Sequence, residues 1–209
     1  MDAQQELDRI AVETYEYLYP LVSMEITRRV ITNAPPGTGL GAGPVNQLHH
    51  VRAFPPGDFR DVVRPNFDTL YSIAWLDLSG GPVVISLERD VDRYFMLPML
   101  DMWTDVFASI GSRTTGGGAA RYLVVGPGWD GETPEGMTVI ASPTPVAWLI
   151  GRVQTNGTDD YEAVHEIQDG MSVAPLEPGS ASGAPDGDVD LSTPPPAQVH
   201  AMTGAQFFA

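Results

Sequence analysis

The sequence predicts a mostly β fold of the α+β class: an antiparallel β-sandwich or barrel-like sheet, with an N-terminal helix and one helix after the sheet. Three observations predict it. Short runs rich in valine, isoleucine and aromatic residues occupy positions 62–151. Turn residues separate these runs by roughly 10 to 15 residues, which leaves most of them no room for an intervening helix. Apolar residues at helical spacing precede and follow this stretch.

The first expected element is a helix from Leu7 to Thr32, where apolar side chains recur every three or four residues. Pro20 lies inside this range. Because proline removes a backbone donor and clashes with the preceding turn, we expect a kink or a break near Tyr19. Asn33 and the prolines that follow it end the helix.

A loop and then a series of strands follow. Residues 35–47 are rich in glycine and proline, which is typical of a loop. A second helix starts near Asp159 or Asp160, either of which can cap it, and ends at Gly170. The strands that we expect are Ile73–Leu78, Val83–Leu87, Tyr94–Leu97, Tyr122–Val125 and Met137–Ile140.

The chain divides into four segments. We expect a helical segment at 1–34, a strand-rich core domain at 35–177, a linker rich in Pro, Gly, Ser and Asp at 178–194, and the start of a helix at 195–209. The sequence ends at Phe207, Phe208 and Ala209. We therefore expect either that the chain stops early or that this tail docks on the core or on another subunit, as in a homo-oligomer.

Composition excludes several functions. The 27 acidic and 11 basic residues give a net charge of -16, which repels nucleic acid and anionic membranes. No lysine and no cysteine occurs, so Schiff-base chemistry, a phosphate-loop lysine and thiolate chemistry are excluded. No apolar run is long enough to cross a membrane, and the start lacks a secretory signal. We expect a cytoplasmic protein without metal or cofactor.

Several motifs occur in a fixed order between positions 63 and 176. With them the chain resembles the family called domain of unknown function 1254. The resemblance implies that the helix from residue 195 leads to a second, jelly-roll domain that is absent here, and it implies little about function. The motifs are Arg64-Pro65-Asn66-Phe67-Asp68-Thr69-Leu70-Tyr71-Ser72, Ala74-Trp75-Leu76-Asp77-Leu78, Asp92-Arg93-Tyr94-Phe95, Asp101, Gly111-Ser112-Arg113, Val125-Gly126-Pro127-Gly128-Trp129, Pro143-Thr144, Gly151-Arg152 and Ile167-Gln168.

Three residues are candidates for acid–base catalysis. Asn66 and Asp68 stand two apart in an extended segment, so their side chains share a face and can orient a ligand hydroxyl or a water. His50 precedes this segment in the sequence and is a candidate base. Asp101 is the third catalytic candidate, beside His50 and Asp68. Alternatively, Asp68 and Asn66 accept backbone N–H groups and lock a turn, and the histidine is a surface residue.

The candidate substrate-binding residues are Asn66, Tyr71, Trp103, Arg93, Arg113 and Arg152. Arginine presents a planar pair of donors that fits a carboxylate. The alternative is internal ion pairing, for example of Arg93 or Arg113 with Asp101. Likewise, Trp103 is either part of a binding wall or a packing residue.

Two hypotheses on function follow. In the first, the residues from 50 to 101 converge on one cleft, and the domain is an enzyme that acts on a small polar organic molecule by acid–base chemistry. In the second, the domain is a non-catalytic ligand-binding or assembly scaffold whose polar residues hold the fold together. The sequence leaves the choice between them open.

Overall fold

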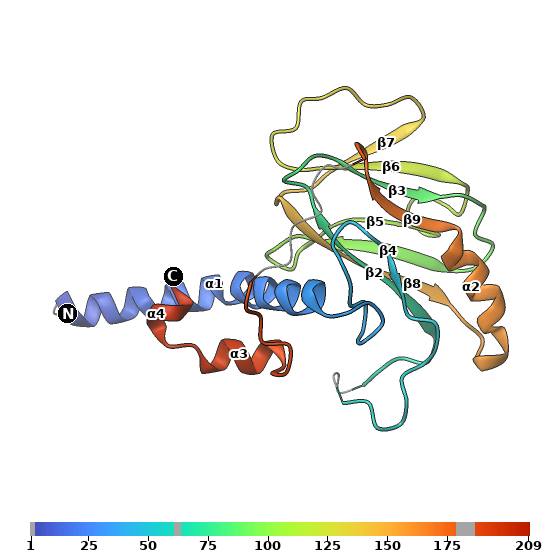
Figure 1. Ribbon diagram of the computed structural model, residues 1–209. Helices are drawn as coiled ribbons and strands as arrows, with labels where there is room; N and C mark the ends of the chain where they lie inside the picture. Colours follow the sequence, from blue (N-terminus) through green and yellow to red (C-terminus); the bar gives the residue numbers. More distant parts are fainter. Residues whose placement is uncertain (1–2, 61–63, 179–186) are drawn as a thin grey trace.

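Two β-sheets packed face to face make up most of the molecule, and a long helix extends from them (Figure 1). The computed structural model describes residues 3–60, 64–178 and 187–209. The predicted linker at 178–194 is described only in part, because residues 179–186 lie outside the described residues. In chain order the elements are α1 (Ala3–Asn33), β1 (His49–His50), β2 (Thr69–Asp77), β3 (Val83–Leu87), β4 (Phe95–Leu100), β5 (Val106–Gly111), β6 (Ala120–Val125), β7 (Met137–Ala141), β8 (Val146–Gln154), η1 (Thr158–Asp160), α2 (Tyr161–Asp169), β9 (Met171–Pro175), α3 (Pro195–Ala201) and α4 (Gly204–Phe207).

The strands form two open sheets. The five-stranded sheet has the order β1-β2-β8-β4-β5, and the four-stranded sheet has the order β7-β6-β3-β9. The strand pairs are antiparallel apart from β6 with β7, which run parallel. The predicted mostly β fold with flanking helices is therefore confirmed. Of the two predicted forms, the structure is the sandwich, and the sheets do not close into a barrel.

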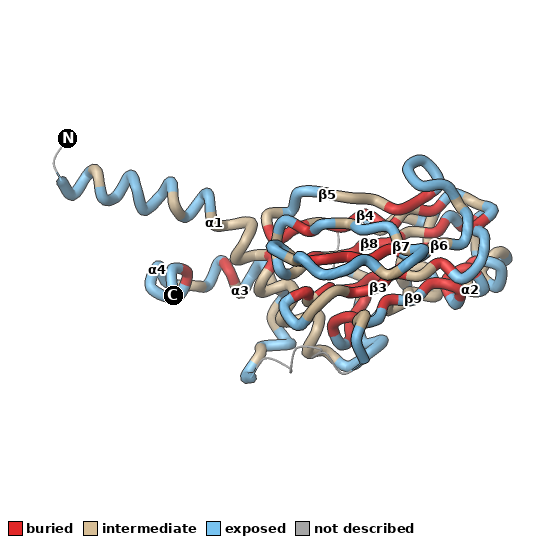
Figure 2. The backbone as a smooth tube through the Cα atoms, turned by 90° about the horizontal axis from the view of Figure 1, so that it is seen from above, coloured by how far each residue is buried: buried red, intermediate tan, exposed pale blue. Residues whose placement is uncertain are grey.

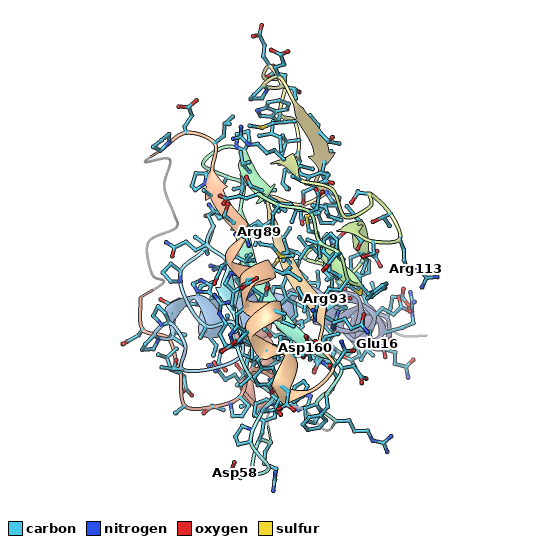
Figure 3. The ribbon with its side chains drawn as sticks, turned by 90° about the vertical axis from the view of Figure 1, so that its right-hand side faces the viewer. Glu16, Asp58, Arg89, Arg93, Arg113 and Asp160 are labelled. Carbon is cyan, nitrogen blue, oxygen red and sulfur yellow. The ribbon has the colours of Figure 1, made fainter. Side chains whose placement is uncertain are left out.

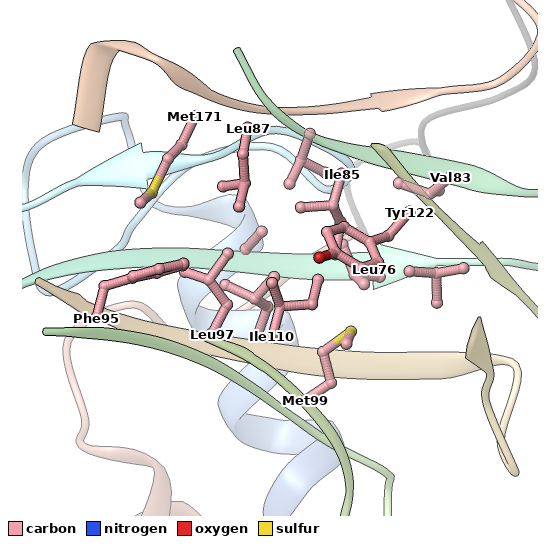
Figure 4. Close-up of a cluster of buried hydrophobic side chains, with 14 of the residues drawn as sticks. Leu76, Val83, Ile85, Leu87, Phe95, Leu97, Met99, Ile110, Tyr122 and Met171 are labelled. Atoms are coloured by element: carbon pink, nitrogen blue, oxygen red, sulfur yellow. The ribbon is translucent and has the colours of Figure 1, made fainter. Parts of the chain in front are cut away.

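The main hydrophobic core lies between the two sheets, where side chains from both point toward each other (Figure 4). Leu76 and Leu97 come from the five-stranded sheet, and Ile85 and Tyr122 come from the other. Helix α2 covers one end of the sandwich (Figure 1) and adds Val164 to the same core. This core fixes the position of the strands that carry the candidate site.

Strand β2 is buried on both faces. Because neighbouring side chains in a strand point to opposite sides, Leu76 faces the core between the sheets while Trp75 packs against Met24 of α1. Strand β8 approaches β2 very closely at Gly151. A Cβ there would lie 2.6 Å from Leu97 Cδ2 and 2.7 Å from the Ser72 carbonyl oxygen, so only glycine fits.

The strands expected from the sequence are all present, with ends that shift by a few residues. Strands β1, β5, β8 and β9 lie outside the runs named from the sequence. Glycine and arginine interrupt β8, and β9 follows α2 after a single residue, which hides both patterns.

Helix α1 continues across Pro20 without a break, contrary to one form of the expectation. A proline inside a helix costs about 3 kcal/mol because it removes one backbone hydrogen bond. The residues after it pack on the five-stranded sheet through Leu21 and Met24, and this contact holds the helical path. The first half of α1 is largely exposed (Figure 2), as Leu7 and Tyr17 show with exposed fractions of 60% and 68%.

The C-terminal tail lies along α1 (Figure 1). Phe207 is buried, and its ring centroid lies 4.5 Å from that of Tyr15. The Tyr19 hydroxyl lies 3.0 Å from Nε2 of His200 in α3. Phe208 is exposed. The tail thus contacts the N-terminal helix, while the boundaries of the four segments stay predictions.

Candidate functional site

A cavity of about 690 Å³ lies beside β1 and the first residues of β2. Four short segments line it, at 37–40, 50–56, 64–66 and 69–71, together with Phe59. Much of its wall is apolar. Small-molecule sites have volumes of roughly 300–1,000 Å³ and mostly apolar walls with a few polar groups. The cavity therefore has the dimensions and the lining that such a site needs.

A tight turn just before β2 shapes one wall of the cavity. The Asn66 side-chain oxygen accepts three hydrogen bonds: from the backbone N–H of Asp68 (3.1 Å), and from the backbone N–H (2.9 Å) and hydroxyl (2.9 Å) of Thr69. Because only an oxygen can accept these bonds, the amide nitrogen faces the other way. It donates to the Tyr71 hydroxyl at 2.6 Å. Asn66 therefore locks the turn and positions Tyr71.

Helix α2 holds the opposite wall, the segment 50–54. Gln168 is fully buried, and its amide nitrogen donates to the carbonyl oxygens of Tyr71 (2.9 Å) and Val51 (3.3 Å). Arg52 forms an ion pair with Asp169, which keeps the pKa of that carboxyl below its usual value. The Phe54 backbone N–H donates to the Tyr161 hydroxyl at 2.8 Å. This wall is thus held from outside the cavity.

His50 lies where β1 meets β2, and it lines the cavity. Its Nδ1 lies 2.8 Å from the Ser72 hydroxyl oxygen, which is buried. Burial, with a further contribution from the nearby Arg52 charge, lowers the pKa of His50 to about 4. The imidazole is therefore neutral at physiological pH.

The charges around the cavity differ from those of the whole chain. Among the described residues, two arginines and no carboxylate line it, although acidic residues outnumber basic ones by 27 to 11 in the sequence. Arg52 is engaged with Asp169 and α2. Arg64 is exposed and has no ion pair or hydrogen bond to any described residue. Its charge is therefore available to a ligand.

Of the predicted site residues, His50, Asn66 and Tyr71 meet at this cavity. Arg152 lies next to them, with its guanidinium carbon 5.1 Å from the centre of the Tyr71 ring. It lies opposite Tyr71 in the pairing of β2 with β8. The structure thus brings three predicted residues to one cavity, whereas the three predicted catalytic residues, His50, Asp68 and Asp101, do not share it.

Asp68 does not line the cavity. Its side chain is exposed, and its hydrogen bonds are made by the backbone: the carbonyl accepts from the Thr155 N–H at 2.9 Å, and the N–H donates to Asn66. Of the two residues expected to lock this turn, Asn66 does so through its side chain, and Asp68 takes part only as a backbone donor.

Asp101 and Trp103 lie at the far end of the five-stranded sheet. The cavity end of β2 starts at Thr69, which pairs with Gln154, whereas Leu100 pairs with Trp148 at the other end of β8. The buried Asp101 carboxylate accepts from the backbone N–H groups of Trp103 (2.8 Å) and Asp105 (3.1 Å). It thus stabilises the turn between β4 and β5. The Trp103 ring lies 4.8 Å from that of Tyr17 in α1.

The two remaining arginines point elsewhere (Figure 3). Arg93 forms an ion pair with Asp160 at 2.6 Å and donates to the Gln154 carbonyl oxygen at 3.2 Å. This bond keeps the pKa of Asp160 below its usual value, and the carboxylate consequently makes no capping bond to α2. Arg113 extends away from the domain in Figure 3. The predicted pairing of either arginine with Asp101 is not found, and Arg93 pairs internally with a different carboxylate.

A sequence model described as a protein of unknown function, DUF1254, matches residues 45–175, which is more than half of the chain. The chain belongs to the DUF1254 family. The resemblance inferred from the motifs is thereby confirmed. No curated protein matches the chain.

One solved structure supports the fold of this DUF1254 chain. The VPA0106 protein from Vibrio parahaemolyticus aligns with a TM-score of 0.60 and 23% identity over 82% of this chain and 40% of that chain. An uncharacterized protein from Burkholderia cenocepacia aligns with a TM-score of 0.44 and 14% identity over 94% and 48% of the two chains. The DUF1254 chain thus spans less than half the length of either protein.

Sequence reasoning missed three residues of the site. Arg64 and Gln168 stand in the family motifs, yet their types alone did not distinguish them from surface residues. Gln168 carried a usable signal, since it lies on the apolar face of the DUF1254 helix α2, where a polar side chain needs a buried partner. Arg52 carried none, because its partner Asp169 is 117 residues away in sequence.

Two further features are absent from the described part of the DUF1254 chain. No three His, Asp or Glu side chains in it are grouped closely enough to hold a metal ion. Each of its helices falls short of the length and apolar character that a membrane crossing requires.

Proposed function

We propose that this domain binds a small organic molecule in the cavity between β1, the start of β2 and the loop at 37–40. One observation carries the proposal: a space of about 690 Å³ with apolar walls also contains His50, Asn66 and Tyr71. Apolar walls supply affinity, and a few fixed polar groups supply orientation.

The polar groups are held in place before a ligand arrives. Asn66 makes three hydrogen bonds within its own turn and a fourth to Tyr71. Gln168 fixes the backbone of Val51, next to His50, and that of Tyr71. Binding therefore requires little ordering of these side chains. Such preorganisation raises affinity because the entropic cost of binding falls.

The geometry favours binding over the acid–base chemistry expected as the first hypothesis. Asp68 is exposed outside the cavity, and Asp101 lies at the other end of the sheet. The low pKa of His50 makes its imidazole a weak base at neutral pH. The proposed function therefore needs only the cavity and its donors, with no proton transfer.

A blocking variant tests this function. Ala53 is exposed at the cavity wall, so Ala53→Trp should fill part of the space without disturbing the core. Ala119→Trp is the matched control, because Ala119 is exposed in the loop between β5 and β6. Each protein is screened by thermal shift against a panel of metabolites.

We expect ligands that raise the melting temperature of the wild type and of Ala119→Trp, but not that of Ala53→Trp. A panel without any stabilising compound would favour the scaffold hypothesis. Compounds that stabilise Ala53→Trp as well as the wild type would also contradict binding at this cavity.

A further inference from the structure

The hydrogen-bonding capacity that remains free at the cavity consists mainly of donors. The Asn66 oxygen already accepts three bonds, so its side chain has only an N–H left to offer. The Tyr71 hydroxyl oxygen accepts from Asn66 at 2.6 Å, and its own proton has no acceptor among the described residues. An amide that donates to a hydroxyl also strengthens that hydroxyl as a donor.

His50 also keeps an unused hydrogen-bond donor. The Ser72 hydroxyl is buried, so its proton needs an acceptor. Nδ1 of His50, at 2.8 Å, is the acceptor in reach. The neutral imidazole then carries its proton on Nε2, which makes His50 a further donor.

Positive charge adds to these donors. Arg64 lines the cavity, has no partner among the described residues, and faces no carboxylate of the described lining. In a chain with a net charge of -16, a wall that carries a free arginine and no carboxylate among its described residues selects for ligands of negative charge. A single unengaged arginine matches a monoanion, since a guanidinium and a carboxylate form a two-point contact.

We infer that the ligand of this cavity is an amphipathic carboxylate, whose anionic end meets Arg64 and the neutral donors and whose apolar body lies against the Phe54 and Phe59 side of the lining. This inference rests on the proposed function, because it names the ligand class of the same site. A ligand that ends in an amine would place donor against donor.

Probes that share one body and differ only in the head group test the inference. They are 4-phenylbutyrate, 4-phenylbutanamide and 4-phenylbutylamine, together with the corresponding octanoate, octanamide and octylamine. Dissociation constants are measured by calorimetry on the wild type, on Arg64→Gln and on Arg113→Gln. Arg113 is the matched control because it is exposed, has no described partner and points away from the domain.

For the wild type we expect each acid to bind about tenfold more tightly than its amide, and the amine to bind most weakly. Arg64→Gln should weaken binding of the acid roughly five- to tenfold and leave the amide unchanged. Arg113→Gln should behave as the wild type does. Raising the salt concentration should reduce the preference of the wild type for the acid.

The failures are distinguishable. If an amide or an amine binds as tightly as the acid, or if Arg64→Gln weakens all three equally, the carboxylate inference is wrong while the binding function stands. If no probe of either body binds, and the metabolite screen also finds no ligand blocked by Ala53→Trp, the proposed function itself fails.

Discussion

The two ends of strand β2 are built differently. At the Thr69 end, a cavity of about 690 Å³ lies beside polar side chains with unused donors. At the Asp77 end, Trp75 stacks on Trp148 with ring centroids 5.1 Å apart, and α1 covers them. Strand β2 thus has a cavity with a few polar side chains at one end and close apolar packing at the other.

The difference shows that polar residues of the family motifs serve different purposes according to their place. Asn66 and Asp101 both accept backbone N–H groups and both stabilise a turn. Asn66 does so next to the cavity and also positions Tyr71, whereas Asp101 stabilises a turn at the other end of the five-stranded sheet. A polar residue in a motif is therefore a functional candidate only where a cavity is also present.

The largest effect is expected at the packed end. Trp75 is 2% exposed, so Trp75→Ala should lower the free energy of unfolding by about 3–5 kcal/mol through lost burial and a new cavity. Urea denaturation measures this change. A loss below about 1 kcal/mol would show that the contact between α1 and the sheet contributes little.

The next effect separates the two predicted catalytic carboxylates. Asp101→Ala leaves two backbone N–H groups without their acceptor and should cost about 1–3 kcal/mol. Asp68→Ala removes an exposed carboxylate and should change the free energy of unfolding by less than about 0.5 kcal/mol. Equal costs for the two variants, measured by urea denaturation, would contradict the roles assigned here.

The sequence predicted the fold well and the site only partly, for physical reasons. Strands such as Val83–Leu87 reveal themselves by local composition, because burial in a sandwich selects apolar, β-branched residues. The grouping of Asn66 and Tyr71 followed from their nearness in sequence, and the pairing of β1 with β2 brings His50 to them. The location of Asp101 did not follow in this way, because the register of β4 on β8 places it, and no local pattern encodes that register.

An intermediate effect concerns His50 and pH. Its pKa in the folded state is about 4, below the ordinary 6.5, so the unfolded chain binds the proton more readily. The stability that this group contributes is complete above pH 6.5 and is lost as the pH falls toward 4. After allowance for solvent screening of a partly exposed ring, we expect a loss of about 1–2 kcal/mol.

The variant His50→Gln isolates this contribution, because the carboxylates that titrate at lower pH are common to both proteins. Free energies of unfolding are compared at pH 7.5 and 4.5. The advantage of the wild type over the variant should shrink on acidification. An advantage that stays constant or grows would show that His50 is not held as a neutral imidazole.

The smallest effect is expected at Arg64. Because it has no described partner, Arg64→Gln should alter the free energy of unfolding by less than about 0.5 kcal/mol, as measured by urea denaturation. A larger loss would mean that its charge serves the fold and is not available to a ligand. Trp75→Ala and Arg64→Gln thus give the largest and the smallest expected change in the free energy of unfolding.

Amide hydrogen exchange, with and without saturating 4-phenylbutyrate, tests the central claim most directly. We predict that the ligand slows exchange at 37–40, 50–56 and 64–71 and leaves the turn at 101–105 unchanged. Protection that is absent from the cavity segments, or that appears equally at the turn around Asp101, would contradict a ligand site at the Thr69 end of β2.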